Sequence, residues 1–273
     1  MYKLIAIDMD GTLLNDQHEV SGKVKETIAE AKKSGVKIVL CSGRPFVGML
    51  PYIEELNLND EGDYLIAYNG AVTKDTHTGE VVSEISLQYE DLVELYELSV
   101  ELDTPMHFFD IDQLYTPNKK ISKFTILESY LNDMPLTFCP VEEFPKNRTI
   151  PNISYIDYPE KLSRTIDNIP ASITEKYAFT VSAPHFSEFT HREATKGNAV
   201  KKLAEHLGIK QEEVMTIGDN GNDMSMIEYA GCGVAMGNAI PELKEAADYI
   251  TLSNNENGVA HAIQKFVLDK LEV

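Results

Sequence analysis

Two aspartates near the N-terminus, separated by one residue, are the strongest candidates for chemistry in this 273-residue chain. Asp8 and Asp10 directly follow an apolar run of strand length at residues 2–7. Side chains two apart on a strand project to the same side, and Gly11 lets the backbone turn away behind them. Because buried carboxylates need a partner, the pair favours metal-assisted chemistry, with a solvated turn as the simpler alternative. An EF-hand fits poorly, since a strand precedes the pair and no third ligand has the loop spacing.

A second group of polar residues follows the next strand along the chain. Residues 36–40 are largely apolar and β-branched, and a helix with Ser21 as its N-cap separates them from the first strand. Strand, helix and strand in this order predict a right-handed parallel crossover. Ligands of such sheets bind outside the carboxyl ends of the strands, so we expect Ser42, Gly43 and Arg44 on the same rim as the two aspartates.

A third strand and a tight turn come next. We expect a helix from Pro45 to Leu56, with the proline in its first turn, and a short strand at residues 64–67. The strand closes on Asn69-Gly70, a strong hairpin signal between segments of alternating hydrophobicity. A purely structural role explains this turn as well as a substrate contact at Asn69 does.

The pattern of predicted strands and helices changes between residues 83 and 189. Short strands and isolated helical segments are punctuated by prolines there, which suits an α+β insert better than continued α/β alternation. We therefore predict an α/β protein whose Rossmann-like parallel-sheet core comprises residues 1–82 and 190–273, with an inserted α+β cap at 83–189. Glu188, where the chain returns from the insert, is a candidate substrate contact.

The last third of the chain supplies two more polar groups. Lys196 and Gly197 open a helix that carries an apolar face. Another core strand, at residues 214–217, is followed by Asp219, Asn222 and Asp223, so carboxylates again stand just past a strand.

Composition limits the partners. The chain has 24 basic and 44 acidic residues, a formal net charge of −20, which makes nucleic acid and anionic membranes poor partners. The same charge repels an anionic small molecule at long range, so such a substrate needs a local positive site. Three distant cysteines, the absence of a secretory signal pattern and the absence of a run of 18 apolar residues lead us to expect a cytoplasmic protein.

Four motifs occur in a fixed order: Asp8-Met9-Asp10-Gly11-Thr12, Ser42-Gly43-Arg44-Pro45, Thr195-Lys196-Gly197 and Gly218-Asp219-x-x-Asn222-Asp223. Together they resemble the motifs of the haloacid dehalogenase (HAD) superfamily of phosphohydrolases. The large insert, with Tyr68-Asn69-Gly70 and the run from Gly233 to Ala239, is similar to the Cof-type branch with a class IIB cap, which includes bacterial sugar phosphatases. The resemblance spans nearly the whole chain and is weakest in the insert.

The resemblance implies a phosphoric monoester hydrolase that acts on small phosphorylated metabolites, sugar phosphates above all. Asp8 would attack phosphorus and form an aspartyl-phosphate, and Asp10 would protonate the leaving group and then activate water. Oxygen-only ligands imply Mg²⁺, held by Asp8, Asp219 and the backbone carbonyl of Asp10.

The resemblance also implies roles around the phosphate. Ser42, Gly43, Lys196 and Asn222 would bind it, and Asp223 would orient the lysine or a metal-bound water. Apart from these roles, Arg44, Asn69 and Glu188 are candidate substrate contacts.

Two other functions use the same residues. A sugar phosphomutase or phosphotransferase would pass the phosphoryl group from the aspartate to a second hydroxyl instead of water. A catalytically inactive metal- and phosphate-binding module would have lost Asp8, Asp10 or Lys196, and all three are present.

Overall fold

The computed structural model describes residues 1–269, which fall into two compact units. The first unit comprises Met1–Gly43, Leu50–Glu84 and the chain from Thr195 onward. The second comprises Arg44–Met49 and Ile85–Ala194. Across the described residues, no helix combines the length and the apolar character needed to cross a membrane.

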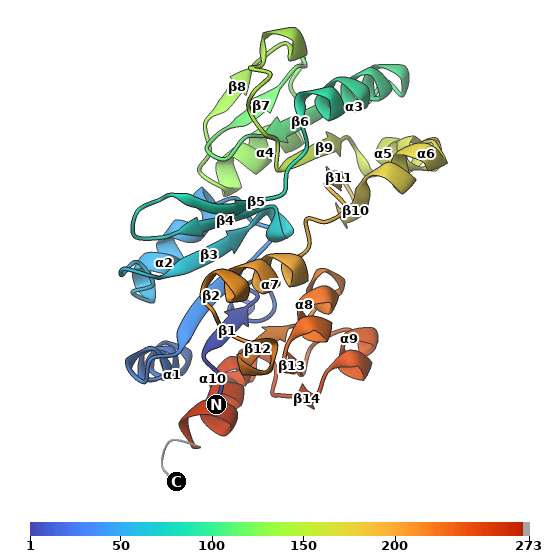
Figure 1. Ribbon diagram of the computed structural model, residues 1–273. Coiled ribbons are helices and arrows are strands. Elements are labelled where there is room, and N and C mark those ends of the chain that lie inside the picture. Colours follow the sequence, from blue (N-terminus) through green and yellow to red (C-terminus); the bar gives the residue numbers. More distant parts are fainter. Residues whose placement is uncertain (270–273) are drawn as a thin grey trace. The chain divides into compact units, whose positions relative to one another are not determined.

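The first unit is built on a mixed, mostly parallel sheet (Figure 1). Its strands, within the described residues, are β1 (Leu4–Ile7), β2 (Lys37–Cys41), β3 (Tyr64–Ala67), β4 (Val72–Asp75), β5 (Val81–Glu84), β12 (Val214–Gly218), β13 (Cys232–Ala235) and β14 (Tyr249–Ile250). They lie in the order β14-β13-β12-β1-β2-β3-β4-β5. Pairing is parallel from β14 to β3 and antiparallel at β4 and β5, which confirms the predicted α/β class.

The N-terminal strand occupies the middle of this sheet. Its first residue, Leu4, is in register with Val214 of β12 on one side and with Lys37 of β2 on the other. All four residues of β1 are completely buried, as expected of a parallel strand covered on both faces. The sheet therefore joins the first and last thirds of the chain.

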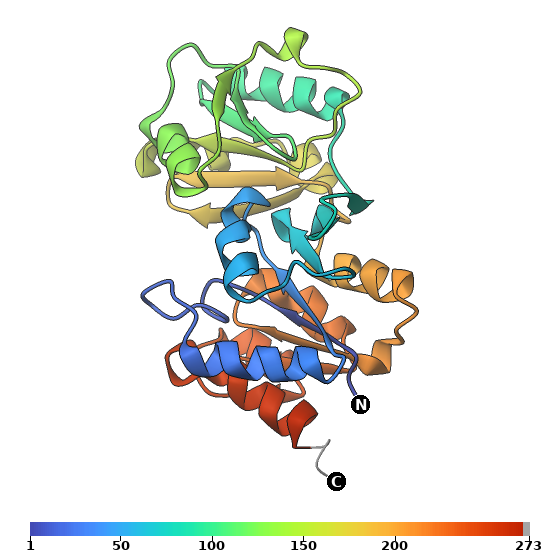
Figure 2. The same ribbon diagram turned by 90° about the vertical axis from the view of Figure 1, so that its left-hand side faces the viewer.

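Helices cover both faces of the sheet. They are α1 (Gly22–Lys33), α2 (Leu50–Glu55), α7 (Lys196–His206), α8 (Met224–Tyr229), α9 (Pro241–Ala246) and α10 (Gly258–Ile263). Leu4 and Ala6 of β1 pack against α7, through residues such as Val200, and against Met226 of α8. Helices α1 and α10 lie side by side (Figure 2).

Two helix starts show how local sequence sets the boundaries. Ser21 caps α1 as predicted, because its side chain accepts a hydrogen bond from the Val24 amide at 3.2 Å. The helix predicted from Pro45 instead begins as a short 3-10 turn at Val47–Met49 and becomes α-helical only at Leu50. Pro51 explains the delay, since a proline fits the first turn of a helix but clashes with the preceding turn in its interior.

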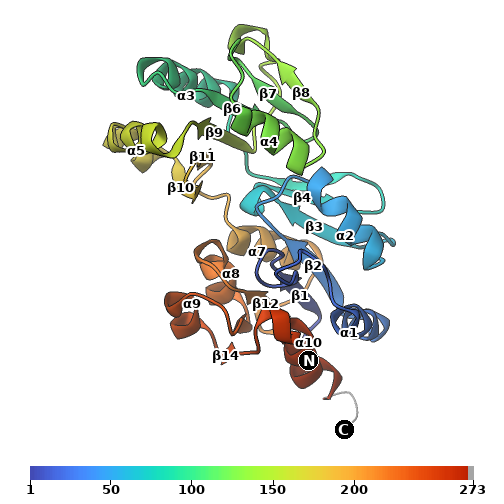
Figure 3. The ribbon, with the colours of Figure 1, turned by 180° about the vertical axis from the view of Figure 1, so that it is seen from behind.

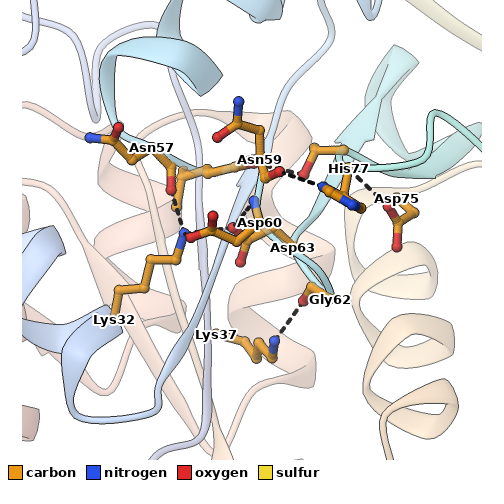
Figure 4. A network of polar contacts seen from close by, with 11 residues as sticks. Lys32, Lys37, Asn57, Asn59, Asp60, Gly62, Asp63, Asp75 and His77 are labelled. Atoms are coloured by element: carbon orange, nitrogen blue, oxygen red, sulfur yellow. Dashed lines mark hydrogen bonds and ion pairs between the residues drawn. The ribbon is translucent and has the colours of Figure 1, made fainter.

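A polar network fastens the loop at residues 57–63 to α1 (Figure 4). The Lys32 ammonium donates to the backbone carbonyl of Asn57, to Asp60 at 2.8 Å and to Asp63 at 2.6 Å. The Asp63 side chain is buried and also accepts from the Asp60 amide at 3.0 Å. One lysine thus compensates a buried carboxylate and satisfies a backbone carbonyl of the loop that leads into β3.

The second unit contains its own sheet. The strands are β6 (Met106–Phe109), β7 (Leu114–Thr116), β8 (Leu136–Phe138), β9 (Asn152–Ile156), β10 (Ala178–Ala183) and β11 (Phe186–Thr190), in the order β10-β11-β9-β6-β7-β8. The helices are α3 (Tyr89–Glu101), α4 (Lys123–Leu131), α5 (Pro159–Asp167) and α6 (Ala171–Lys176). One face of the sheet, with Phe108, Tyr155 and Phe189, forms an apolar core with side chains of α3, α5 and α6.

The opposite face of this second sheet carries α4 (Figure 3). Phe124 of α4 stacks on His185 at 4.4 Å between ring centroids and contacts Phe186 edge-on at 6.5 Å. His107 lies on the same face, with its ring against Phe186 and Phe109. Burial lowers the pKa of His107 to about 3, so the imidazole is neutral at physiological pH.

Candidate active site

A buried lysine is the centre of the candidate site in the first unit. The Nζ atom of Lys196 donates to Asp8 Oδ1 at 2.5 Å and to Asp223 Oδ1 at 2.6 Å, and its side chain is completely buried. Two carboxylates therefore share one ammonium at the carboxyl ends of β1 and β12. An unpaired lysine at this depth would be too costly to keep charged, so the three side chains depend on one another.

The start of α7 aims the lysine. Thr195 caps the helix by accepting from the Asn198 amide at 3.1 Å, which fixes Lys196 as the first helical residue. Two glycines allow the close approach of the surrounding backbone. A Cβ atom on Gly197 would lie 2.2 Å from the Ser225 carbonyl oxygen, and one on Gly70 would lie 2.2 Å from the Thr195 carbonyl oxygen.

Asp219 reaches the same place from the end of β12. Its Oδ1 atom accepts a hydrogen bond from the Thr12 hydroxyl at 2.8 Å. Gly11 has a φ of +84°, and a Cβ atom there would lie only 2.5 Å from Asp219 Oδ2. The glycine of the first motif is thus required both by the backbone conformation and by the carboxylate packed against it.

Asp223 organises the turn after β12. Its Oδ2 atom accepts from the backbone amides of Asp219 at 2.9 Å and Asn220 at 3.0 Å, while Oδ1 accepts from Lys196. The residue is completely buried. With both oxygens engaged by donors, Asp223 is arranged to orient the lysine and the Asp219 backbone.

Three carboxylates meet closely enough to hold a cation. Asp8, Asp219 and Asp223 each offer an oxygen, and these atoms lie within 4.8 Å of one another. The donor set consists of oxygen alone, as hard divalent cations such as Mg²⁺ prefer. Because the two oxygens of Asp223 already accept from nitrogen donors, Asp8 and Asp219 are the side chains best placed to ligate.

The pKa shifts describe a site with too much negative charge. Burial raises the pKa of Asp8 well above its usual range, Lys196 opposes the rise, and the Asp223 carboxylate adds to it. Burial and the Asp223 charge raise the pKa of Asp219 as well. Burial alone would lower the pKa of Lys196, but the charges on Asp8 and Asp223 raise it, so the ammonium persists. A bound cation would compensate the remaining carboxylate charge.

Asp10 lies in the turn after β1 and is exposed, in contrast to Asp8. The turn is closed by backbone hydrogen bonds from Thr12 and Leu14 to the Met9 carbonyl. His18 Nδ1 lies 3.8 Å from Asp10 Oδ1, and both side chains are about half exposed or more. Asp10 therefore faces solvent, where a substrate could reach it.

Ser42 and Asn222 are joined through Asn69. The Asn69 amide donates to the Ser42 carbonyl at 2.9 Å, and Asn69 Oδ1 accepts from Asn222 Nδ2 at 3.0 Å. A Cβ atom on Gly43 would lie 3.0 Å from Asn69 Nδ2. Asn69 thus bridges the loop after β2, through its backbone amide, to the loop after β12, through its side chain.

An unusual backbone holds Asn69 in this position. Tyr68, Asn69 and Gly70 have φ values of +52°, +54° and +101°, three consecutive residues in the left-handed region. Asparagine and glycine tolerate this region, whereas a buried tyrosine adopts it only when its surroundings enforce it. The Asn-Gly pair is therefore a turn, as its sequence predicted, and Asn69 also orients a residue of the fourth motif.

The structure brings together most of the predicted site residues. One rim of the first unit carries Asp8, Asp10, Ser42, Gly43, Asn69, Lys196, Asp219, Asn222 and Asp223. Arg44 and Glu188 belong to the second unit, Glu188 on β11, and they remain predicted substrate contacts. The sequence assigned no role to Thr12, although its place in the first motif was a signal that could have suggested one.

Comparison with known proteins agrees with this geometry. The family described as haloacid dehalogenase-like hydrolase matches residues 5–263. The chain is 62% identical to the "putative phosphatase YxeH" of Bacillus subtilis over 270 residues, which cover 99% of this chain and 100% of that protein.

Solved structures agree as well. A haloacid dehalogenase-like hydrolase from Bacteroides thetaiotaomicron superposes with a TM-score of 0.86 at 34% identity, covering 97% of this chain and 99% of that one. A sugar phosphatase of HAD subclass IIB superposes with a TM-score of 0.77 at 28% identity, covering 97% and 98%. With the family match spanning nearly its whole length, the chain belongs to the haloacid dehalogenase-like hydrolases.

Proposed function

We propose that this protein is a Mg²⁺-dependent phosphatase that hydrolyses small phosphorylated metabolites, sugar phosphates above all, through an aspartyl-phosphate on Asp8. The observation that carries the proposal is the buried Lys196, which holds Asp8 at 2.5 Å beside Asp219 and the exposed Asp10. The similarity to the putative phosphatase YxeH and to the sugar phosphatase of HAD subclass IIB supports it.

Asp8, Asp219 and the backbone carbonyl of Asp10 would hold the magnesium ion. Bound there, a divalent cation neutralises charge on the carboxylates and on the phosphoryl group. Lys196 opposes the rise in the Asp8 pKa, which the cation would oppose further, and it holds one Asp8 oxygen in place, so the other is available as the nucleophile. Asp223 acts through Lys196 and the Asp219 backbone.

Attack by the Asp8 carboxylate forms an oxygen–phosphorus bond as the bond to the departing alcohol breaks. Asp10, which is exposed at the rim, would give its proton to that alcohol and then take one from the water that hydrolyses the aspartyl-phosphate. The Ser42 hydroxyl, the Gly43 amide and the Asn222 side chain would donate to the phosphoryl oxygens, with Asn69 holding the last of these.

Residues 83–189 would act as the cap that selects the substrate, with Arg44 and Glu188 as candidate contacts. The subclass of the solved sugar phosphatase favours this division of labour between the core and an inserted cap. Substrate choice by such a cap would act through differential binding of the part of the molecule that does not react.

The test is phosphate release from a panel of phosphomonoesters that includes hexose phosphates, flavin mononucleotide and pyridoxal phosphate. We expect turnover with Mg²⁺, loss of turnover with a chelator and recovery on adding the metal back. Asp8→Asn should lower kcat by at least about 10⁴-fold, since it removes the nucleophile.

Three results would overturn the proposal. No release from any ester would leave a binding module, and full activity in Asp8→Asn would exclude the aspartyl-phosphate. Transfer of labelled phosphate between sugar positions with little free phosphate would instead identify a phosphomutase or phosphotransferase. Glu55→Gln, which alters an exposed pair with Lys25, is the matched control and should keep full activity.

A further inference from the structure

Two asparagines outside the catalytic motifs hold the loop that carries Asp10. Asn238 Nδ2 donates to the Gly11 carbonyl at 2.8 Å, and Asn254 Nδ2 donates to the Leu14 carbonyl at 3.0 Å. They come from the turn after β13 and the segment before α10, more than 220 residues away along the chain. The segment Gly11–Leu14, directly after Asp10, is thus held at both of its ends by side chains of the C-terminal third.

The two asparagines are also joined to each other and to the site. The Asn254 amide donates to Asn238 Oδ1 at 3.0 Å, so the Asn238 side chain is held at both its oxygen and its nitrogen. Two residues after Asn238, the Ile240 amide donates to the carbonyl of Asp219 at 3.0 Å. One turn therefore contacts the backbone on both sides of the candidate metal site.

The loop needs such support because its residues lie beyond the end of β1 and are not part of the regular hydrogen-bond ladder of the sheet. Gly11 has a positive φ, and beyond the strand end the Gly11 and Leu14 carbonyls accept from these asparagine side chains. The Gly11 carbonyl that Asn238 holds belongs to the peptide plane between Gly11 and Thr12, one plane beyond the one that contains the Asp10 carbonyl. A shift of this plane is passed back to Asp10 through the Gly11 backbone dihedrals. An amide suits the task because it donates and accepts at once.

We propose that Asn238 and Asn254 are positioning residues for Asp10, which they hold in the orientation that protonates the leaving alcohol. The inference rests on the proposed function, in which Asp10 is the general acid. A small rotation of this loop would leave the contacts of Lys196 with Asp8 and Asp223 in place, because neither contact involves the two asparagines or residues 11–14.

The dependence of the rate on the leaving group distinguishes a positioning role for the two asparagines from a merely structural one. An alkoxide leaving from a hexose 6-phosphate needs a proton, whereas the nitrophenolate of p-nitrophenyl phosphate leaves readily without one. Misplacing the general acid should therefore slow the alkyl ester far more than the aryl ester. General loosening of the fold should slow both alike.

The experiment measures kcat and KM for both esters at saturating Mg²⁺ in wild type, Asn238→Ala and Asn254→Ala, with Asp10→Asn as the reference. We expect kcat/KM, which reports the steps up to the aspartyl-phosphate, to fall by about tenfold for the alkyl ester in each asparagine variant and by no more than about twofold for p-nitrophenyl phosphate. The comparison uses kcat/KM because kcat also contains hydrolysis of the aspartyl-phosphate, a step common to both esters in which Asp10 would activate the water. Asp10→Asn should show the same selectivity more strongly. Asn255→Ala is the matched control, because its side chain forms hydrogen bonds with Asp16, two residues beyond Leu14, and the variant should leave the ratio unchanged.

The outcomes test the positioning role of the asparagines separately from the proposed phosphatase function. Equal losses on both esters, or wild-type selectivity in Asn238→Ala and Asn254→Ala, would overturn the positioning role while leaving the phosphatase intact. No turnover of either ester by wild type would overturn the proposed function itself. If Asn238→Ala does not fold, as judged by its thermal unfolding, Asn254→Ala carries the same test through the other end of the loop.

Discussion

Single side chains of the site position more than one neighbour, and Asp223 is the clearest example. One of its oxygens accepts from Lys196 and the other from two backbone amides, so a single carboxylate sets both the ammonium and the Asp219 turn. A side chain of equal size but no charge could not replace it, because the ammonium would lose half of its countercharge while remaining buried.

Asp223→Asn should therefore impair catalysis and stability together. We expect kcat to fall by at least about 10²-fold and the free energy of unfolding to fall by about 2 to 4 kcal/mol, since a buried ion pair loses one partner. Steady-state kinetics and urea denaturation measure the two effects. Glu55→Gln serves again as the control, and wild-type values for Asp223→Asn in both measurements would contradict the coupling.

The sequence indicated which residues lie at the rim of the sheet, but not which hydrogen bonds they form with one another. Two aspartates at a strand end, a lysine at a helix start and carboxylates past a second strand each carry a local signal. The hydrogen bond from Thr12 to Asp219 and that from Asn238 to Gly11 join residues more than 200 positions apart. Such contacts depend on how distant loops meet at the rim, which local sequence does not determine.

Among the secondary-structure elements, strands and capped helices followed their local patterns, whereas α2 did not. Ser21 and the apolar face of α1 were sufficient to predict that helix, and the apolar run of β1 predicted a buried strand. The start of α2 depends on which of two prolines occupies the first turn. A helix that began at Pro45 would place Pro51 in its interior, where a proline breaks the helix, so α2 begins at Leu50 with Pro51 in its first turn.

Helix α4 carries a carboxyl group whose protonation should affect stability. Burial raises the pKa of Glu128 to about 7, the charge of Glu188 on β11 adds to the rise, and the hydrogen bond from Asn132 opposes it. In the unfolded chain the pKa returns to about 4.5, so ionisation disfavours the folded state as pH rises between these two values. The destabilisation is absent below pH 4.5 and complete above pH 7.

Glu128→Gln should remove this pH dependence. At pH 8 the variant should be more stable than wild type by about 2 to 3 kcal/mol, and at pH 4.5 the two should agree. Urea denaturation at both pH values measures the difference. Glu97→Gln, on an exposed position of α3, removes one negative charge as a control; an equal gain in that variant would assign the effect to net charge instead.

At the scale of the whole molecule, the net charge of −20 opposes the approach of a phosphorylated substrate. In the first unit, the positive charge beside the carboxylates comes from Lys196, which is completely buried, and from the proposed cation. The net charge of the protein acts over longer distances than Lys196 or the cation does. The net charge therefore governs the approach of the substrate, whereas Lys196 and the cation govern its binding in the site.

Raising NaCl from 10 to 150 mM should therefore increase kcat/KM for a hexose phosphate by about twofold or more. The Debye length shortens from about 30 Å to about 8 Å, which screens the distant repulsion and leaves the buried contacts almost unchanged. Saturating Mg²⁺ keeps metal binding constant, and kcat should stay the same. A fall in kcat/KM with salt would show that local attraction outweighs the net charge.

The position of β1 in the middle of its sheet has a consequence for how the chain is made. Its partner β12 lies about 210 residues further along, so a ribosome adding about 5 to 20 residues per second supplies it some 10 to 40 s later. Residues 85–194 are completed in that interval and can form their own core first. Until then, the backbone groups along one edge of β1 have no strand partner, which exposes the nascent strand to non-native pairing.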